Sequence, residues 1–215
     1  MNIISASIIA LILAYLIGSF PSAYLIGKLR KGVDIRQVGS RNMGAMNVFY
    51  KVGFWWGMIV LLLDIGKGAL AAGAAWLIVK PVDLQLAGYI QLAAGVLAVL
   101  GHSFPIFLKF KGGKGGATCI GALLYVMPWG VPVYLAIFGI LMLITRFPTL
   151  SYGVAFLGFP FLAVFLYQNT TYIIYWVVIL LIPLFRYIPR VKEMHAGAGG
   201  SWKHVFVRRS LKDRL

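Results

Sequence analysis

The sequence contains one cysteine, Cys119, and only five acidic residues among 215. A single cysteine excludes a disulfide framework and a cysteine-rich metal site. Charged residues make up 12% of the chain and hydrophobic residues 61%, whereas a soluble domain carries about 25% charged residues. The chain is therefore not an ordinary soluble domain, and it is too hydrophobic for a disordered one. Its apolar runs are also longer than the strands of a membrane β-barrel, which have about ten residues. We expect an all-α integral membrane protein.

Positive charge is what the sequence has in excess. Lysine and arginine number 20, and the net charge is +15. In a soluble protein this excess would suggest nucleic-acid binding. In a membrane protein, basic residues mark the cytoplasmic side and attract anionic lipids. We therefore expect anionic membrane lipids and no nucleic acid among the partners, and an anionic substrate can share the same charge.

The apolar runs predict a polytopic protein with seven transmembrane helices, two of them short. The runs cover residues 3–26, 54–79, 84–104, 117–145, 151–167 and 172–187. The 117–145 run is divided into two short helices at Met127-Pro128-Trp129-Gly130, because proline and glycine favour a break.

Seven helices place the N-terminus outside and the C-terminus in the cytoplasm. The cytoplasmic loops are then 27–53, 105–116 and 146–150, and with the end of the chain they hold 18 of the 20 basic residues. This distribution follows the positive-inside rule, which an even number of helices would violate.

The chain shows no tandem repeat and no low-complexity linker. We expect a single transmembrane helical domain over residues 1–196 and a basic tail over residues 197–215. In the tail, apolar residues such as Trp202 and Phe206 alternate with lysines and arginines. This pattern is typical of a short amphipathic helix on an anionic membrane surface. A solvated basic tail is the alternative.

Two glycine-rich polar segments, residues 39–47 and 110–118, fall on the predicted cytoplasmic side. Glycine lets backbone N–H groups turn toward an anion, lysine adds positive charge, and the N-terminus of the following helix adds partial positive charge. The segment 110–118 therefore predicts a phosphate cradle, although its spacing is not that of a P-loop. A flexible loop rich in glycine and lysine is the alternative.

Carboxylates are scarce in these loops. Asp34 is the only acid in the first, and the second has none. A paired-carboxylate mechanism is therefore improbable, as is a two-metal site, because Mg²⁺ prefers carboxylate ligands. We expect a site that binds phosphate electrostatically and holds no metal or cofactor.

Four motifs follow one another along the chain. They are Gly18-Ser19-x-Pro21, Asp34-Ile35-Arg36-x-x-Gly39-Ser40-x-Asn42-x-Gly44-Ala45-x-Asn47, Asp64-x-x-Lys67-Gly68 and Gly101-His102-Ser103-Phe104-Pro105-x-Phe107-x-x-Phe110-Lys111-Gly112-Gly113-Lys114-Gly115-x-Ala117-Thr118. Over residues 10–190 the chain thus resembles the bacterial acyl-phosphate:glycerol-3-phosphate acyltransferases. The resemblance implies a seven-helix, multi-pass protein of the bacterial inner membrane whose active site faces the cytoplasm. It also implies transfer of an acyl group from acyl phosphate to the 1-hydroxyl of glycerol 3-phosphate, giving lysophosphatidic acid and phosphate.

By this resemblance Ser40, Asn47 and Lys114 occupy catalytic positions. The predicted substrate-binding residues are Arg36, Arg41, Asn42, Gly44, His102, Lys111, Gly112, Gly113, Gly115 and Thr149. Our hypothesis is that Lys114 and the amides of residues 112–116 hold a phosphate, while Ser40 and Asn47 orient the glycerol or the anhydride.

Several of these residues have a simpler interpretation. Arg36 and Arg41 bind the glycerol phosphate or contact lipid headgroups, and His102 binds phosphate or makes a structural polar contact. Asp64 and Lys67, three residues apart on one helix face, are expected to form an ion pair that anchors the loops.

The chain departs from the family pattern at several positions. Arg41 stands where the family usually has glycine, Met46 where it has threonine and Tyr50 where it has arginine, while Tyr152 replaces a serine. The histidine and asparagine usual before the final Ile-x-Arg element are absent. These departures keep open a diverged, non-catalytic member that acts as a lipid-binding or structural subunit with membrane-complex partners. A transporter or channel is a third possibility, weakened by the lack of a polar midplane path and of an inverted repeat.

Overall fold

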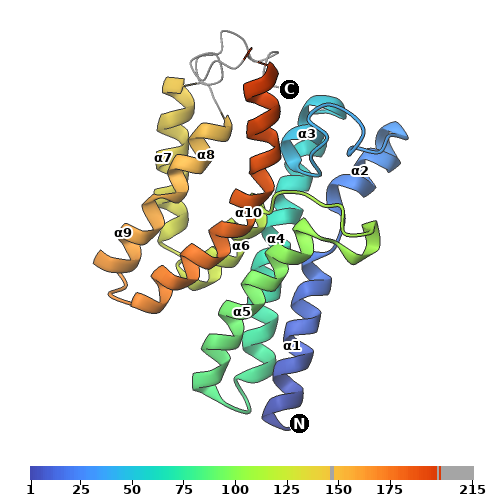
Figure 1. Cartoon of the computed structure of the whole chain (residues 1–215). Helices are drawn as coiled ribbons and strands as arrows, with labels where there is room; N and C mark the ends of the chain where they lie inside the picture. Colours follow the sequence, from blue (N-terminus) through green and yellow to red (C-terminus); the bar gives the residue numbers. More distant parts are fainter. Residues whose placement is uncertain (146–147, 198, 200–215) are drawn as a thin grey trace.

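The computed structural model describes residues 1–145, 148–197 and 199, and all regular secondary structure in this part of the chain is helical (Figure 1). In chain order the elements are α1 (Ile3–Gly18), α2 (Ser22–Lys31), α3 (Ala45–Lys51), α4 (Phe54–Val79), α5 (Leu84–Ser103), the 3₁₀ turn η1 (Ile106–Leu108), α6 (Gly116–Val126), α7 (Gly130–Thr145), α8 (Pro148–Phe156), α9 (Gly158–Phe165) and α10 (Thr170–Gly197).

The predicted apolar runs all appear as helices. Four segments are long and apolar enough to cross a membrane, namely Ile3–Lys31, Phe54–Val79, Leu84–Leu108 and Thr170–Glu193, and three shorter apolar helices accompany them. The expected break in the 117–145 run is confirmed, because α6 ends at Val126 and α7 begins at Gly130. Pro128 lies in this gap and has no N–H group to continue the helix.

The prediction of one continuous helix over residues 3–26 is wrong, because this run forms two helices, α1 and α2. The chain breaks between Gly18 and Ser22, where Pro21 cannot donate a backbone hydrogen bond. The break leaves the carbonyl of Phe20 available, and it accepts a hydrogen bond from Lys67 at 3.1 Å.

The predicted cytoplasmic loops are shorter and more structured than expected. Loop 27–53 contains the end of α2 and all of α3, and loop 105–116 contains η1. Loop 146–150 is wrong for residues 148–150, which form the first turn of α8, with Pro148 at its first position, where proline is favoured. Residues 146 and 147 lie outside the described part.

The last helix is also longer than expected, since α10 continues beyond residue 187 to Gly197. The predicted tail, residues 197–215, lies outside the described residues except for Gly197 and Gly199.

Small residues let the long helices approach closely. Gly18 and Gly101 bring α1 against α5, and a Cβ atom at Gly101 would collide with the carbonyl oxygen of Tyr15. Gly68 and Gly121 do the same between α4 and α6. Close backbone approach through small residues is the usual packing of membrane helices. It makes α1, α4, α5 and α6 the frame on which the polar loops sit.

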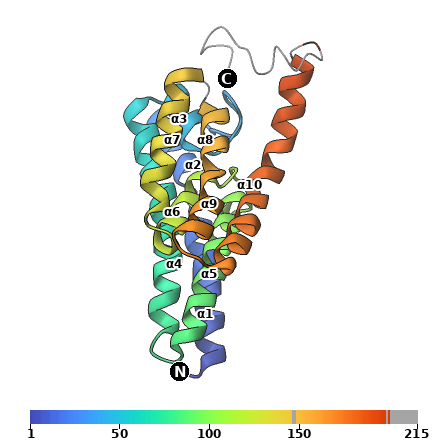
Figure 2. The same cartoon turned by 90° about the vertical axis from the view of Figure 1, so that its left-hand side faces the viewer.

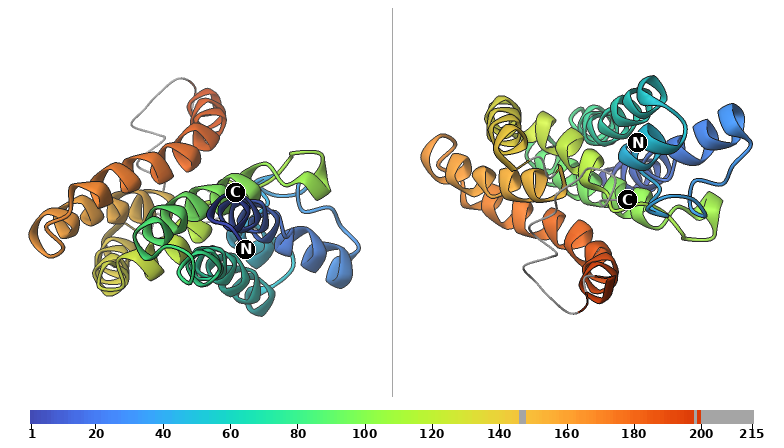
Figure 3. Two further views of the ribbon diagram at one scale, coloured as in Figure 1. Left: turned by 90° about the horizontal axis from the view of Figure 1, so that it is seen from below. Right: turned by 90° about the horizontal axis from the view of Figure 1, so that it is seen from above.

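The helices that follow α6 form a second group. α7, α8 and α9 pack around the aromatic side chains of Tyr134, Phe156 and Phe159, in a cluster that α6 and α10 complete. Seen along the bundle, this group lies beside the α1, α4 and α5 group (Figure 3). The C-terminal half of α10 rises at the end of the molecule where α3 and α8 lie (Figure 2). The N-terminus lies at the opposite end (Figure 1).

Candidate active site

The two glycine-rich polar loops are in direct contact. Arg36 of the first loop donates a hydrogen bond to the carbonyl of Leu108 in the second at 3.4 Å. The backbone of Gly113 lies against the carbonyl of Met43, so closely that a Cβ atom there would collide with it. The sequence prediction that both loops belong to one site is thus consistent with their positions.

Buried side chains anchor the first loop. Ile35 and Met43 are at most 1% exposed and pack with Ala23, Val48 and Val60 in a small core between α2, α3 and α4. The loop is therefore folded onto these helices.

Asn47 organises this loop. It is fully buried, and its Nδ2 donates to the carbonyls of Ile35 at 2.8 Å, Val38 at 3.0 Å and Asn42 at 3.0 Å. Its Oδ1 accepts a hydrogen bond from the backbone N–H of Ser40 at 3.2 Å. Both ends of the amide are thus used within the loop. Asn47 is predicted to orient the glycerol or the anhydride, and in the structure its hydrogen bonds shape the loop that carries Ser40.

The predicted residues around Asn47 differ in exposure. Ser40 is half-buried, and none of the described residues hydrogen-bonds to its hydroxyl, so the group can meet a ligand. Arg41 is exposed and has φ +55°, in the left-handed region that favours glycine. The usual glycine at this position therefore has a conformational reason. Asn42 and Gly44 are half-buried, and Gly44 is the residue that precedes α3.

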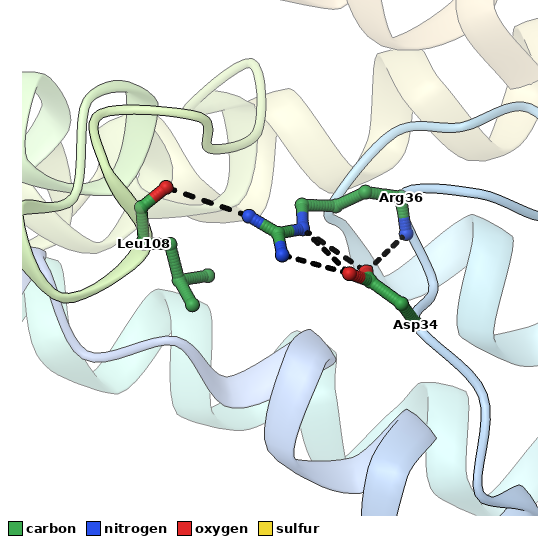
Figure 4. A network of polar contacts seen from close by, with 3 residues as sticks. All are labelled: Asp34, Arg36 and Leu108. Atoms are coloured by element: carbon green, nitrogen blue, oxygen red, sulfur yellow. Dashed lines mark hydrogen bonds and ion pairs between the residues drawn. The ribbon is translucent and has the colours of Figure 1, made fainter.

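Arg36 is engaged by Asp34 (Figure 4). Its Nη2 and Nε donate to the two carboxylate oxygens at 2.7 Å and 3.0 Å, and its Nη1 reaches the Leu108 carbonyl. Hydrogen bonding to Arg36 holds the pKa of the Asp34 carboxyl below its usual value. Arg36 thus links the two loops through its bond to Leu108. The ion pair with Asp34 compensates part of its positive charge.

A cavity of about 660 Å³ opens between these loops and α10. Its lining combines five basic residues with a single acid that is already paired: Asp34, Arg36, Gln37, Arg41, Phe107, Leu108, Lys109, Phe110, Lys111, Gly112 and Arg186. A concave, predominantly basic site of this kind suits a phosphate group. The predicted residues Arg36, Arg41, Lys111 and Gly112 meet here.

The second loop corrects part of the predicted phosphate cradle. The amide of Gly112 donates to the carbonyl of Ser103 at 3.2 Å, and the amide of Gly113 donates to that of His102 at 3.1 Å. These two amides hold the loop against the end of α5 and do not face a ligand. Glycine is required at both positions for space, because a Cβ atom would collide with the His102 backbone at Gly112 and with the His102 ring at Gly113.

The rest of the cradle remains available. Gly115 has φ +88° and precedes α6, and the described residues offer no hydrogen-bond acceptor to the amides of Gly115 and Gly116. The buried hydroxyls of Ser103 and Thr118 also lack a partner within the described part of the chain. Amides at a helix N-terminus favour an anion. Ser103 and Thr118 belong to the fourth motif but are not among the predicted substrate-binding residues. Their burial, Ser103 beside Gly115 and Thr118 in α6, is visible only in the structure.

The last helix, α10, reaches this loop. Arg186 donates from Nη2 to the carbonyl of Gly112 at 2.9 Å and from Nε to that of Gly113 at 3.1 Å. The next residue, Tyr187, places its ring centroid 3.9 Å from the Nζ of Lys114. The sequence offered no signal for these contacts, since more than 70 residues separate the partners.

A buried charged cluster lies beneath the loops. Lys67 pairs with Asp64 at 2.8 Å, which confirms the predicted ion pair, and Ser22 donates to the same carboxylate at 2.6 Å. His102 is 4% exposed, with Nδ1 3.6 Å from the Asp64 carboxylate. This position favours the structural interpretation of His102, which supports Gly113 from below.

Two residues of α8, the predicted substrate-binding residue Thr149 and the nearby Ser151, carry aliphatic hydroxyl groups. Thr149 belongs to α8, and its side chain is outside the described part. Ser151 is fully buried, with its hydroxyl 3.2 Å from that of Thr145.

Lys111, the remaining predicted substrate-binding lysine, is exposed and lines the cavity.

The arrangement brings together groups that favour an oxyanion. These are the lysine and arginine side chains at the cavity, the amides before α6, and the hydroxyls of Ser40, Ser103 and Thr118. Within the described ranges no group of three or more histidine, cysteine, aspartate or glutamate residues could hold a metal ion. The chemistry that such a site supports is charge neutralisation and alignment of phosphate-bearing substrates.

Comparison with known proteins agrees with this geometry. Residues 8–197 match the family described as Glycerol-3-phosphate acyltransferase. The chain is 50% identical over 216 residues to Glycerol-3-phosphate acyltransferase 2 of Dehalococcoides mccartyi (strain ATCC BAA-2266 / KCTC 15142 / 195), with 100% of each chain covered. It is 49% identical over 141 residues to the Glycerol-3-phosphate acyltransferase of Bacillus subtilis (strain 168), covering 66% of this chain and 69% of that one.

Solved structures show the same fold. The glycerol 3-phosphate form of PlsY (YgiH), an integral membrane glycerol 3-phosphate acyltransferase, superposes with a TM-score of 0.77 at 33% identity, covering 89% of this chain and 92% of that one. The lysophosphatidic acid form of the same protein gives a TM-score of 0.75 at 32% identity over the same shares. The chain therefore belongs to the glycerol-3-phosphate acyltransferase family of multi-pass integral membrane proteins.

Proposed function

We propose that this protein transfers a fatty acyl group from acyl phosphate to the 1-hydroxyl of glycerol 3-phosphate, giving lysophosphatidic acid and phosphate. The observation that carries the proposal is the contact between the two loops. On one side lie Lys114 and the amides of Gly115 and Gly116, to which no described residue offers an acceptor, and on the other lies a basic cavity. Two anionic substrates need two such places. The solved relatives, described in a glycerol 3-phosphate form and a lysophosphatidic acid form, are consistent with this substrate and product.

The reaction requires no protein nucleophile. Acyl phosphate is a mixed anhydride, so its phosphate leaves readily once it is neutralised. We assign the acyl phosphate to Lys114 with the amides of Gly115 and Gly116, and the phosphate of glycerol 3-phosphate to the cavity, at Arg41 and Lys111. The 1-hydroxyl oxygen attacks the acyl carbon, the anhydride C–O bond breaks, and the departing phosphate takes the hydroxyl proton. Ser40 hydrogen-bonds one of the reactants and holds the geometry.

We also infer that the site faces the cytoplasm of a bacterial inner membrane. The N-terminus and the C-terminal end of α10 lie at opposite ends of the bundle, as seven crossings require. The basic loops lie at the end where α2, α3 and the last part of α10 are found. The positive-inside rule places this end in the cytoplasm.

A diverged, non-catalytic member is the second candidate, and one observation favours it. Tyr152, which stands where the family usually has serine, lies beside Gly116, and a Cβ atom there would be 3.5 Å from its ring. An aromatic ring at the cradle changes its shape. Three of the other departures, Arg41, Met46 and Tyr50, are exposed and leave the Asn47 hydrogen bonds intact.

One assay separates the two candidates. Purified protein receives palmitoyl phosphate and labelled glycerol 3-phosphate, and lysophosphatidic acid is measured. We expect turnover in the native protein and none in Lys114→Ala, with unchanged turnover in Lys80→Ala, a matched exposed lysine remote from the loops. Phosphate binding without turnover would support the non-catalytic candidate. Turnover with acyl-CoA but not with palmitoyl phosphate would contradict the proposed donor.

A further inference from the structure

α10 contributes two adjacent residues to the glycine–lysine loop that no sequence motif contains. Arg186 contacts the carbonyls of Gly112 and Gly113, and Tyr187 contacts the side chain of Lys114. Consecutive residues of the helix therefore hold consecutive residues of the loop.

Arg186 completes the fixation of the loop backbone. The amides of Gly112 and Gly113 already donate to α5 carbonyls, at Ser103 and His102. With Arg186 on the two carbonyls, Gly112 and Gly113 are each hydrogen-bonded at both their N–H and their C=O. The guanidinium also covers two carbonyl oxygens that would otherwise repel a nearby phosphate, and it lies 5.1 Å from the centroid of Phe104.

Tyr187 contacts the side chain of Lys114, the residue that follows the two glycines. The Lys114 ammonium lies 3.9 Å from the ring centroid, well inside the range of a cation–π contact. A carboxylate in this place would neutralise the lysine and compete with an anionic substrate. An aromatic face attracts the ammonium through its quadrupole and leaves the positive charge uncancelled. The contact thus places the charge while preserving its attraction for phosphate.

We propose that Tyr187 is the positioning residue of Lys114, holding its ammonium over the phosphate-binding end of α6, with Arg186 holding the adjoining backbone. The proposal rests on the proposed function for the role of Lys114 in transfer, but not for its role in binding phosphate. Because the ring provides the contact, phenylalanine can replace tyrosine and leucine cannot.

The test measures the binding of inorganic phosphate to the purified protein in detergent by phosphorus NMR titration. We expect Tyr187→Leu to weaken binding about five- to tenfold, within the range of cation–π contacts, and Tyr187→Phe to stay within twofold of the native protein. Tyr89→Leu, a matched change at an exposed tyrosine of α5, is the control and should change nothing. In a Lys114→Met background, Tyr187→Leu should have no further effect.

Kinetics supply a second readout that a loosened fold would not reproduce. With palmitoyl phosphate and glycerol 3-phosphate varied separately, Tyr187→Leu should raise the KM of the substrate held by Lys114 and leave the other within twofold. A general loss of structure would raise both KM values. The thermal midpoint of unfolding checks that the variant folds.

The outcomes separate this inference from the proposed function. Native binding in Tyr187→Leu, equal damage from Tyr187→Phe, an effect that persists without Lys114, or no phosphate binding by the native protein would each overturn the positioning role. Phosphate binding that follows the expected pattern, in a native protein that does not turn over palmitoyl phosphate, would sustain the positioning role and overturn the proposed reaction alone.

Discussion

The buried charge cluster beneath the loops offers the sharpest test of how the site is held. Lys67 is 5% exposed and Asp64 is 1% exposed, and their ion pair is 2.8 Å long. Lys67 also donates to the Phe20 carbonyl at the break between α1 and α2. Replacing Lys67 by methionine keeps much of the apolar stem and removes the charge. The Asp64 carboxylate then stays buried, and Ser22 and His102 are its remaining polar contacts among the described residues.

The magnitude follows from the burial of both groups. Removing one partner of a buried ion pair costs about 3–5 kcal/mol, because the other charge is left uncompensated. For a chain of this size, each kcal/mol lowers the midpoint of thermal unfolding by about 2–4 °C. We therefore expect Lys67→Met to unfold about 6–20 °C below the native protein. The double variant Asp64→Asn/Lys67→Met should lose about 1–3 kcal/mol less than the sum of the single variants.

The assay is thermal unfolding in detergent, with acyl transfer measured on the same preparations. Lys80→Met is the control, because Lys80 is exposed. A drop of less than about 2 °C in Lys67→Met, below even a 1 kcal/mol loss, would show that the pair does not support the fold. Strict additivity of the two single changes would show that the two charges do not act together.

Three further predictions concern the loops. Gly113→Ala should abolish acyl transfer, because its Cβ atom collides with the His102 ring, whereas Gly88→Ala meets open space and should be neutral; an active Gly113→Ala protein would contradict this packing. Arg41→Gly should raise stability by up to about 1 kcal/mol by relieving a φ of +55°, and a lower unfolding midpoint would count against it. Because the pKa of Asp34 is lowered in the folded state, its pair with Arg36 contributes stability above the model-peptide value of 3.8 and loses it as the pH falls further. In Asp34→Asn the free energy of unfolding should therefore fall less steeply as the pH drops below about 4. An unchanged pH dependence would show that the Asp34–Arg36 pair does not stabilise the fold.

Local signals in the sequence predicted the helices and their principal break. The apolar runs were long enough to define the helices, and proline at position 128 ended one of them because it lacks an N–H group. The ion pair of Asp64 and Lys67 was predictable for the same local reason, since residues three apart share a helix face. The break at Pro21 and the first turn of α8 at Pro148 were missed, although the same chemistry of proline explains both.

The site depended on contacts that no local pattern encodes. Residue types and motif order predicted that the two loops bind phosphate, but not which backbone groups are free to do so. Only the packed structure shows that the Gly112 and Gly113 amides donate to carbonyls of α5, that the Asn47 amide bonds within its own loop, and that Tyr187 of α10 contacts the Lys114 side chain.

The sequence by itself thus determined the membrane class and the helical segments, and it predicted which loops bind an anion, because these follow from hydrophobic length, backbone chemistry and residue type over a few neighbouring positions. The tertiary structure decided which donors remain for a substrate. A hydrogen-bonding group is available only if no distant segment has already paired with it, and whether that has happened depends on the path of the whole chain.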